Sequence, residues 1–223
     1  RRKFSISPPK NTDSNSRAKK GDRMLIFVPM AGFGDRYIRA GYKDPKPLIP
    51  VDGVTMIKRV LEAFAPAQPG DKYLFTVNRQ HSETTPIVSE LKKLVPNATI
   101  IVCETHKDGP IQTLLSSREH IPLDEEVILN YCDFGVDWSY PDFRAWLAKN
   151  KWASAMSGYR GFHPHSLGPT LYAYMRVAPD GETVDEIREK HFFTDNKFNE
   201  FASSGLYYFA SGKLLLDVAE KMI

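Results

Sequence analysis

Apolar residues follow two different rhythms along this chain, and the first one alternates short apolar runs with amphipathic segments. Continuous apolar runs are typical of strands buried on both faces, and they occupy residues 24–28, 72–77, 98–103 and 126–132. Apolar positions spaced three and four apart are typical of helices, and they occupy residues 54–64, 86–95, 110–121 and 140–150. Strands alternating with helices predict a parallel sheet with helices on both faces.

The rhythm changes after Lys151, where strand-like segments outnumber helical ones. Short alternating runs predict strands at residues 153–159, 170–177, 183–189 and 204–210, with "APDG" as a hairpin turn and a closing helix from Gly212. We therefore predict an α/β fold of the Rossmann-like kind. Its mixed, mainly parallel sheet is flanked by helices, and a β-rich half follows it.

Residues 1–22 differ from the rest of the chain in composition. They lack apolar periodicity and are rich in Pro, Ser, Asn and basic side chains. We interpret them as a basic linker or disordered tail and favour this over a nucleic-acid-binding arm. Residues 23–223 then form one domain. Because the first residue is not Met, we expect a piece of a longer polypeptide, and the sequence leaves open fusion to another domain and homo-oligomerisation.

Charge and cysteine content narrow the class of protein. The net charge is +3, and much of the positive excess lies in the N-terminal tail, so we expect no nucleic-acid or membrane partner. No apolar run approaches the length that spans a bilayer. Cys103 and Cys132 are not arranged as CxxC, which indicates reduced thiols in a cytoplasmic protein.

The segment from Met30 to Pro50 combines glycines, prolines and basic residues directly after the first predicted strand. Ligands of such sheets bind at the carboxyl ends of strands, where glycines let the backbone approach phosphates. An ordinary surface loop is the alternative. The segment is not a dinucleotide fingerprint, because Tyr37 stands where a third glycine is needed, and the chain has no Walker loop. We expect the next helix only near Val54.

The string "VPMAGFGDRY…PKPLIPVDGVTMIKRVLEAF" resembles the signature of sugar-1-phosphate nucleotidyltransferases, also called NDP-sugar pyrophosphorylases. Their pattern is A-G-x-G-[TS]-R, then P-K-x-L-x-P, then G-x-P-M-I before a helix. The resemblance covers roughly residues 24–223 and implies a GT-A-like form of the fold. It also implies transfer of a nucleoside monophosphate from a nucleoside triphosphate to a sugar-1-phosphate, or a similar phosphorylated small molecule such as phosphocholine.

The resemblance assigns roles to the residues of this loop. Arg36 and Lys46 are the implied catalytic residues: Arg36 holds the β- and γ-phosphates, and Lys46 stabilises the α-phosphate. The backbone at Ala31, Gly32 and Gly34 faces the nucleotide. These residue types suit the chemistry, because both reactants are anions and catalysis is mainly positioning and charge neutralisation. The prolines around Lys46 fix the backbone that carries it.

Two further segments resemble nucleotide-binding elements of the same family. In "ETHKDGPIQTLLSS", Gly109 corresponds to the glycine beside the nucleobase and Glu104 to a base-reading position. A carboxylate accepts hydrogen bonds, so Glu104 suits the amino group of cytosine or guanine; a solvent-facing Glu104 is the alternative. Asp133 ends the strand "VILNYCDF" and is the implied Mg²⁺ ligand, with a turn-capping aspartate as the alternative.

The β-rich half carries the implied sugar-phosphate contacts. Glu189 and Lys190 match the family's E-K element, and Gly205 lies in a strand similar to its N-x-G-I-Y-x-F strand. A second metal-binding carboxylate usually follows that strand and its helix, so we expect it beyond Ile223. Asp35 replaces the usual Thr or Ser, and its carboxylate is expected to point away from phosphate, bind metal or pair with Arg36.

Two other classes of function remain open. A GT-A glycosyltransferase that consumes an NDP-sugar also needs a nucleotide-binding sheet and a strand-end aspartate. It does not need Arg36 and Lys46 to hold a triphosphate. A non-catalytic domain that senses nucleotide or sugar phosphate is the other candidate, and Asp35 and the missing second carboxylate are its support.

Overall fold

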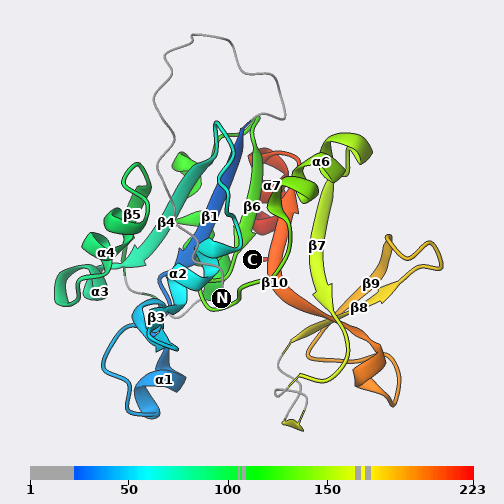
Figure 1. Ribbon diagram of the computed structural model, residues 1–223, viewed down its shortest axis with the longest axis horizontal. Coiled ribbons are helices and arrows are strands. Elements are labelled where there is room, and N and C mark those ends of the chain that lie inside the picture. The colour runs from blue at the N-terminus through cyan, green and yellow to red at the C-terminus, as the bar shows by residue number, and fades with distance from the viewer. Residues whose placement is uncertain (1–22, 105, 107–108, 164–166, 169–171) are drawn as a thin grey trace. The chain divides into compact units, whose positions relative to one another are not determined.

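The computed structural model describes residues 23–104, 106, 109–163, 167–168 and 172–223, so the predicted tail at residues 1–22 lies outside the described residues. The chain divides into two compact units. The first comprises the described residues up to Ser154 together with Tyr208–Ile223, and the second comprises Ala155–Tyr207. Figure 1 labels the elements of both units.

The first unit is built on a parallel sheet with β1 (Met24–Met30) at its centre. β1 pairs in parallel with β4 (Lys72–Asn78) on one side and with β6 (Glu126–Asn130) on the other. β5 (Thr99–Cys103) pairs in parallel with the outer edge of β4. Every residue of β1 is buried, as expected for a strand with both faces covered. The predicted parallel sheet is confirmed.

Helices pack on both faces of this sheet. In Figure 1, α2 (Met56–Glu62) lies in front of the sheet and α7 (Gly212–Glu220) behind it. α5 (Gly109–Leu115) contacts both β1 and α7. α6 (Tyr140–Asn150) is tied to the end of α2, because the Trp138 indole N–H donates to the Ala63 carbonyl at 2.6 Å and Tyr140 packs edge-on against Phe64.

Several element boundaries follow from capping residues in the sequence. α6 begins at the predicted residue because the Ser139 hydroxyl accepts a hydrogen bond from the Asp142 N–H. It ends at Asn150, and its C-cap Lys151 has a left-handed φ of 53°. α4 (Ile87–Leu94) lies within its predicted range. Two single turns of 3₁₀-helix complete the unit, η1 (Lys46–Leu48) and η2 (Arg118–His120).

Three short elements of the first unit were not predicted from the sequence pattern, namely one hairpin and two helices. The helix expected from Val54 begins at Met56, because β2 (Pro50–Val51) and β3 (Val54–Thr55) form a hairpin whose turn residues, Asp52 and Gly53, both have positive φ. Two short helices lie where none was expected. α1 (Asp35–Arg39) follows the glycine loop directly, and α3 (Arg79–Thr84) follows β4.

The second unit is β-rich, as predicted. β8 (Ala173–Val177) pairs antiparallel with β9 (Val184–Glu189) and with β10 (Phe201–Phe209), which continues into the first unit. β7 (Ser154–Tyr159) pairs with β10, and the single turn η4 (Lys197–Asn199) precedes β10. The predicted "APDG" turn is confirmed, because the Asp180 carboxylate accepts from the N–H groups of Glu182 and Thr183.

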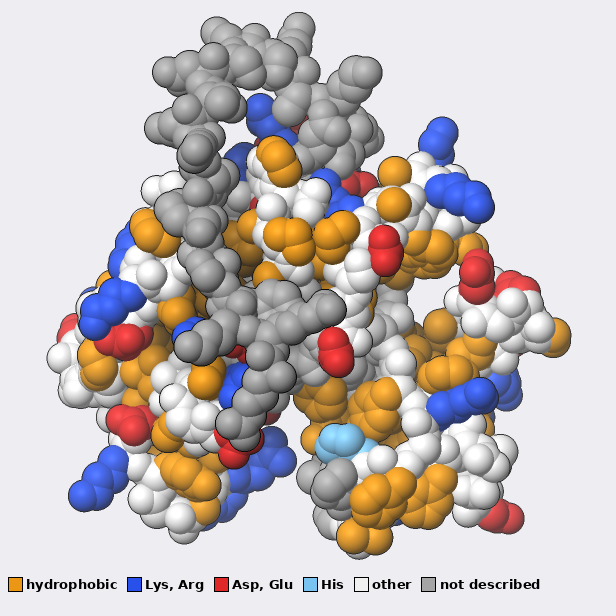
Figure 2. All heavy atoms as spheres, in the orientation of Figure 1, with side chains coloured by type: hydrophobic (Ala, Val, Ile, Leu, Met, Phe, Trp, Pro, Cys, Tyr) orange, Lys and Arg blue, Asp and Glu red, His pale blue; other side chains and the backbone are white. Residues whose placement is uncertain are grey.

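The distribution of charged side chains on the surface agrees with the small net charge of the chain. On the face shown in Figure 2, acidic and basic side chains are interspersed rather than gathered into one basic tract. Within the described part of the chain, no helix has the length and apolar character needed to cross a membrane.

Candidate functional site

The candidate site lies at the carboxyl edge of the parallel sheet in the first unit. β1, β4, β5 and β6 run in the same direction, so the residues that follow them emerge at one edge of the sheet. The predicted site residues of this unit follow three of these strands: Ala31, Gly32 and Gly34 after β1, Glu104 and Gly109 after β5, and Asp133 after β6.

Lys46 and Asp133 meet at this edge although they are far apart in the sequence. The Lys46 Nζ lies 2.5 Å from Asp133 Oδ2, and the two side chains are 21% and 24% exposed. Lys46 begins η1 and is flanked by two buried prolines, Pro45 and Pro47. The rigid backbone therefore holds the lysine while its ammonium group reaches the carboxylate.

The surroundings of Lys46 keep its ammonium group charged. Burial alone would lower its pKa, but the nearby Cys132, Asp133 and Tyr37 more than offset burial, so the pKa of Lys46 is raised. Burial raises the pKa of the Cys132 thiol to about 11, so this thiol is uncharged at neutral pH. Asp133 is therefore the acidic partner of Lys46 under neutral conditions.

Gly34 brings the glycine loop against Lys46. Its φ is +71°, and a Cβ placed on it would lie 3.3 Å from the Lys46 Cβ. A side chain at this position would thus be strained by the backbone and crowded by the lysine. Tyr37, which the sequence did not single out, places its ring centroid 5.7 Å from the Lys46 Nζ, within the range of a cation–π contact.

Arg36 and Asp35 are neighbours on the exposed helix α1. Among the described residues, no ion pair involves either side chain, so the expected pairing of Asp35 with Arg36 is absent from this structure. Consecutive helical residues do not face each other, which explains this. Asp35 is exposed, and its orientation toward a bound phosphate stays a prediction.

Asn130 supports the turn that carries Asp133, and the sequence did not single it out. Its side chain is 1% exposed at the end of β6. The Nδ2 group donates to the Tyr131 carbonyl at 2.8 Å and to the Phe134 carbonyl at 3.0 Å. These two carbonyls flank Cys132 and Asp133, so Asn130 fixes the turn. An asparagine inside an apolar strand is the signal that could have revealed it, because buried amides need partners.

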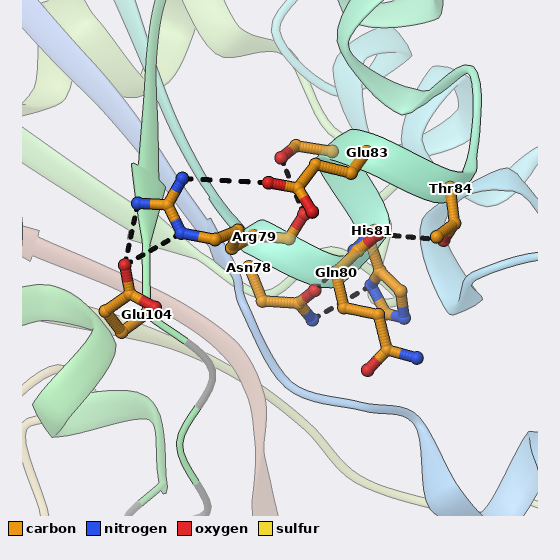
Figure 3. A network of polar contacts seen from close by, with 8 residues as sticks. Asn78, Arg79, Gln80, His81, Glu83, Thr84 and Glu104 are labelled. Atoms are coloured by element: carbon orange, nitrogen blue, oxygen red, sulfur yellow. Dashed lines mark hydrogen bonds and ion pairs between the residues drawn. The ribbon is translucent and has the colours of Figure 1, made fainter.

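Asn78 supports the glycine loop in the same way from the end of β4. Its side chain is fully buried, and its Nδ2 donates to the Ala31 carbonyl at 3.0 Å. Figure 3 shows its carboxamide beside His81, the third residue of α3. Asn130 and Asn78 are thus of the same type: each is a buried amide at a strand end whose side chain donates to the backbone of a candidate loop.

The Glu104 carboxylate is bound to Arg79 in this structure. Arg79 Nε lies 2.8 Å and a terminal nitrogen 2.7 Å from Glu104 Oε1, while Glu104 is 77% exposed (Figure 3). The Arg79 guanidinium lowers the pKa of Glu104, so the carboxylate is ionised at neutral pH. Gly109 begins α5 with a φ of +86° and open space around it. Residues 105 and 107–108 of the same loop lie outside the described residues.

Glu189, Lys190 and Gly205 belong to the second unit and are described within it. Glu189 ends β9, and Lys190 follows with a left-handed φ of 56° and donates its N–H to the Tyr172 carbonyl. Their side chains are exposed and lie 3.8 Å apart. Gly205 is buried inside β10 with a φ of +80°, a conformation that favours glycine.

The described residues contain no group of three or more His, Cys, Asp or Glu side chains that could hold a metal ion by themselves. Asp133 remains as a part-exposed carboxylate at the sheet edge. This arrangement fits Mg²⁺ bound together with phosphates, because such ions are commonly held by one or two protein carboxylates.

Comparisons with known proteins bear on the family and on the fold of this chain. Residues 26–178 match the model of the MobA-like NTP transferase domain family, and this range includes the glycine loop, Lys46 and Asp133. A comparison with curated protein sequences gave no match.

Several solved structures share the fold of this chain. A nucleoside-diphosphate-sugar pyrophosphorylase from Vibrio cholerae RC9 has a TM-score of 0.70 and 20% identity, over 88% of this chain and 78% of that one. An inositol-1-phosphate CTP transferase from T. maritima has a TM-score of 0.68 and 12% identity, over 91% and 76%. A UDP-glucose pyrophosphorylase has a TM-score of 0.65 and 14% identity, over 89% and 80%.

The match to the family model covers more than half of the chain, and the fold agrees with it. The resemblance to nucleotidyltransferases that the glycine loop and the P-K-x-L element indicated is therefore confirmed at the level of the family. The chain belongs to the MobA-like NTP transferase domain family.

Proposed function

We propose that this nucleotidyltransferase domain transfers a nucleoside monophosphate from a nucleoside triphosphate to a sugar-1-phosphate or a similar phosphorylated small molecule. An oxygen of the acceptor phosphate attacks the α-phosphorus, the bond to the β-phosphate oxygen breaks, and pyrophosphate leaves. The observation that carries this proposal is the contact between Lys46 and Asp133 beside the glycine loop. In this contact, a positive charge and a candidate metal ligand lie together at the carboxyl edge of the sheet.

Lys46 and Arg36 are the proposed catalytic residues. Lys46 would bind the α-phosphate and stabilise the negative charge that grows there, since its ammonium stays charged and its backbone is held by prolines. Arg36 lies on the exposed helix α1 with no ion pair to another described residue, and its guanidinium would bind the β- and γ-phosphates. Both roles extend the family resemblance to particular side chains.

Asp133 is the proposed Mg²⁺ ligand. When bound, Mg²⁺ would neutralise phosphate charge and make pyrophosphate a better leaving group. In this structure, Lys46 forms an ion pair with the Asp133 carboxylate. Because the metal and the phosphates carry opposite charges, they can replace the two halves of this ion pair together, and neither Lys46 nor Asp133 is then left without a partner.

Backbone groups are proposed to bind the nucleotide. Ala31, Gly32 and Gly34 would contact phosphates and ribose, and Gly109 would let the chain approach the base through its open, positive-φ conformation. Glu104 would accept a hydrogen bond from the amino group of cytosine or guanine. Arg79 occupies one oxygen of its carboxylate, which leaves the other for the base.

The acceptor is proposed to bind through the second unit. Glu189 would accept hydrogen bonds from hydroxyl groups, Lys190 would bind the phosphate, and Gly205 would allow close approach. The names of the structural neighbours, which include NDP-sugar, UDP-glucose and inositol-1-phosphate enzymes, support a phosphorylated sugar or polyol. The cytoplasmic location and a homo-oligomeric state stay predictions.

Isotope exchange between pyrophosphate and nucleoside triphosphate tests the proposal. Wild-type protein with Mg²⁺ is assayed against each triphosphate and a panel of sugar-1-phosphates and alcohol phosphates. We expect exchange that depends on one acceptor and prefers CTP or GTP. A strict preference for UTP or dTTP would refute the role of Glu104.

Two variants and two matched controls test the residue roles. Lys46→Ala and Asp133→Ala should each lower exchange by about 10²- to 10³-fold. Lys213→Ala and Asp217→Ala disrupt an exposed ion pair on α7, whose N···O distance of 2.6 Å is close to that between Lys46 and Asp133. They should leave exchange unchanged. Full activity of the first two variants would contradict the assigned roles.

The assay also separates the other two classes of function. Sugar transfer from an NDP-sugar without pyrophosphate chemistry would support the glycosyltransferase, which the family match disfavours. Binding of triphosphate without turnover, in a longer protein that extends beyond Ile223, would support a sensing domain.

A further inference from the structure

A single buried carboxamide, that of Asn78, joins three segments at the sheet edge. Its Nδ2 donates to the Ala31 carbonyl at 3.0 Å, which ties the end of β4 to the residue after β1. The same Nδ2 lies 3.0 Å from His81 Nδ1, and its Oδ1 accepts from the His81 backbone N–H at 2.7 Å. In Figure 3 the carboxamide and the imidazole turn toward each other.

These contacts determine which way the carboxamide faces. Oδ1 must point to the His81 N–H, because only the oxygen can accept, so Nδ2 must point to Ala31. The imidazole Nδ1 then accepts the second Nδ2 hydrogen, which makes His81 neutral with its proton on Nε2. Both Nδ2 hydrogens and Oδ1 therefore have defined partners, and a flip of the carboxamide would break all three hydrogen bonds.

The orientation of the Asn78 carboxamide also determines the orientation of the Ala31–Gly32 peptide. The Ala31–Gly32 peptide is planar and trans, so its carbonyl and its N–H point in opposite directions. Because the Ala31 carbonyl is held toward Asn78, the Gly32 N–H points away from β4. Gly32 is exposed, and apart from its two chain neighbours no heavy atom of a described residue lies within 4 Å of where its Cβ would be. Within the described part of the chain, no residue accepts a hydrogen bond from this N–H.

We propose that Asn78 is a positioning residue of the nucleotide site, which holds the Ala31–Gly32 peptide so that the Gly32 N–H faces a bound nucleoside triphosphate. This inference rests on the proposed function. Capping alone does not account for the residue: Asn78 is also the N-cap of α3, but a cap needs only an acceptor, and serine caps about as well. The donor to Ala31 is what a carboxamide adds.

Asn78→Ser separates the two roles of this residue. The serine hydroxyl can still accept from the His81 N–H, but it is too short to reach the Ala31 carbonyl. We expect the Kd for triphosphate to rise roughly tenfold, as for misalignment of one hydrogen bond to a charged group, while the KM for the acceptor is unchanged. Ser211→Ala, which removes the N-cap of α7, is the matched control for loss of stability and should leave the Kd unchanged.

A measurement that needs no nucleotide tests the geometry directly. The NMR order parameter of the Gly32 amide should fall in Asn78→Ser and stay at the wild-type value in Ser211→Ala. If Asn78→Ser does not fold, Asn78→Asp is used, because it keeps the shape and the cap but turns a carboxylate oxygen toward the Ala31 carbonyl. It should loosen Gly32 in the same way.

The two proposals fail in different ways. Unchanged Gly32 mobility in both Asn78 variants, or a Kd within twofold of that of Ser211→Ala, would overturn the role of Asn78. A wild-type protein that binds no triphosphate would instead overturn the proposed function, and with it the link from Asn78 to the nucleotide.

Discussion

Lys46 is the residue on which most of the candidate chemistry depends, and three neighbours determine its position. Gly34 leaves room for its Cβ, the ring of Tyr37 lies near its ammonium, and Asp133 binds that ammonium at 2.5 Å. Gly34 and Tyr37 belong to the glycine loop and to α1, which follows it, whereas Asp133 belongs to the turn after β6. Small changes in these segments should therefore lower the rate of the phosphate reaction without unfolding the protein.

Gly34→Ala tests this dependence against a matched glycine. Gly34 and Gly41 both have positive φ, but only Gly34 has an atom of Lys46 within contact distance. Alanine in the left-handed region should destabilise either variant by about 1–2 kcal/mol. Only Gly34→Ala should also lower pyrophosphate exchange, by about tenfold or more, because it displaces Lys46. Thermal melts and exchange rates measure the two effects, and equal exchange in the two variants would contradict the argument.

At the scale of elements, the junction of β4 and α3 should make stability depend on pH. Burial lowers the pKa of His81 below its ordinary value of 6.5. The unfolded chain then binds a proton more readily than the folded one, so the free energy of unfolding falls as pH drops through about 6.5 and below. The slope from one group is at most about 1.4 kcal/mol per pH unit.

Denaturant unfolding at pH 7.5 and 5.5 measures this loss. His81→Gln should lose less stability than the wild type between these two pH values. His120→Gln, which changes an exposed histidine on η2, is the control and should behave like the wild type. An identical pH dependence in His81→Gln and wild type would show that His81 does not contribute.

α6 is anchored by a buried ion pair. Arg144 donates to Asp71 Oδ1 at 2.7 Å, Tyr140 donates to Asp71 Oδ2 at 3.1 Å, and the Asp71 side chain is 1% exposed. Arg144→Met should destabilise the protein by about 3 kcal/mol, because the carboxylate is left buried without its ion-pair partner. The double variant Asp71→Asn/Arg144→Met should recover most of this loss.

The control is an exposed pair on α7. Lys213→Met removes the partner of Asp217 in solvent and should cost less than about 0.5 kcal/mol. A loss for Arg144→Met as small as this would mean that water, rather than Arg144, stabilises the Asp71 carboxylate.

The length of the apolar pattern decides which elements could be predicted from the sequence and which were missed. The buried strands and α6 carry apolar runs or repeats long enough to identify, and they were confirmed. α1 has five residues and no buried side chain, so it has no apolar periodicity to detect. α3 is polar, and the sequence signal for it is the Asn78 cap.

At the scale of the whole molecule, the parallel sheet brings residues of distant segments to one edge. Motif spacing predicted Lys46 and Asp133 separately, but their direct contact depends on β1 and β6 being neighbours. The pairing of Glu104 with Arg79 was not predictable for the same reason, because it joins the ends of β4 and β5 across 25 residues. The supporting amides Asn78 and Asn130 became recognisable only through their bonds to backbone.

The central claim is that this domain transfers a nucleotidyl group and that Lys46 stabilises the reaction at the α-phosphate. The most direct measurement is Mg²⁺-dependent exchange of labelled pyrophosphate into nucleoside triphosphate, in wild type, Lys46→Ala and Lys213→Ala. We expect exchange in the wild type and in Lys213→Ala, and a loss of about 10²- to 10³-fold in Lys46→Ala. Equal exchange in all three proteins, or no exchange by the wild type with any triphosphate and acceptor, would contradict it.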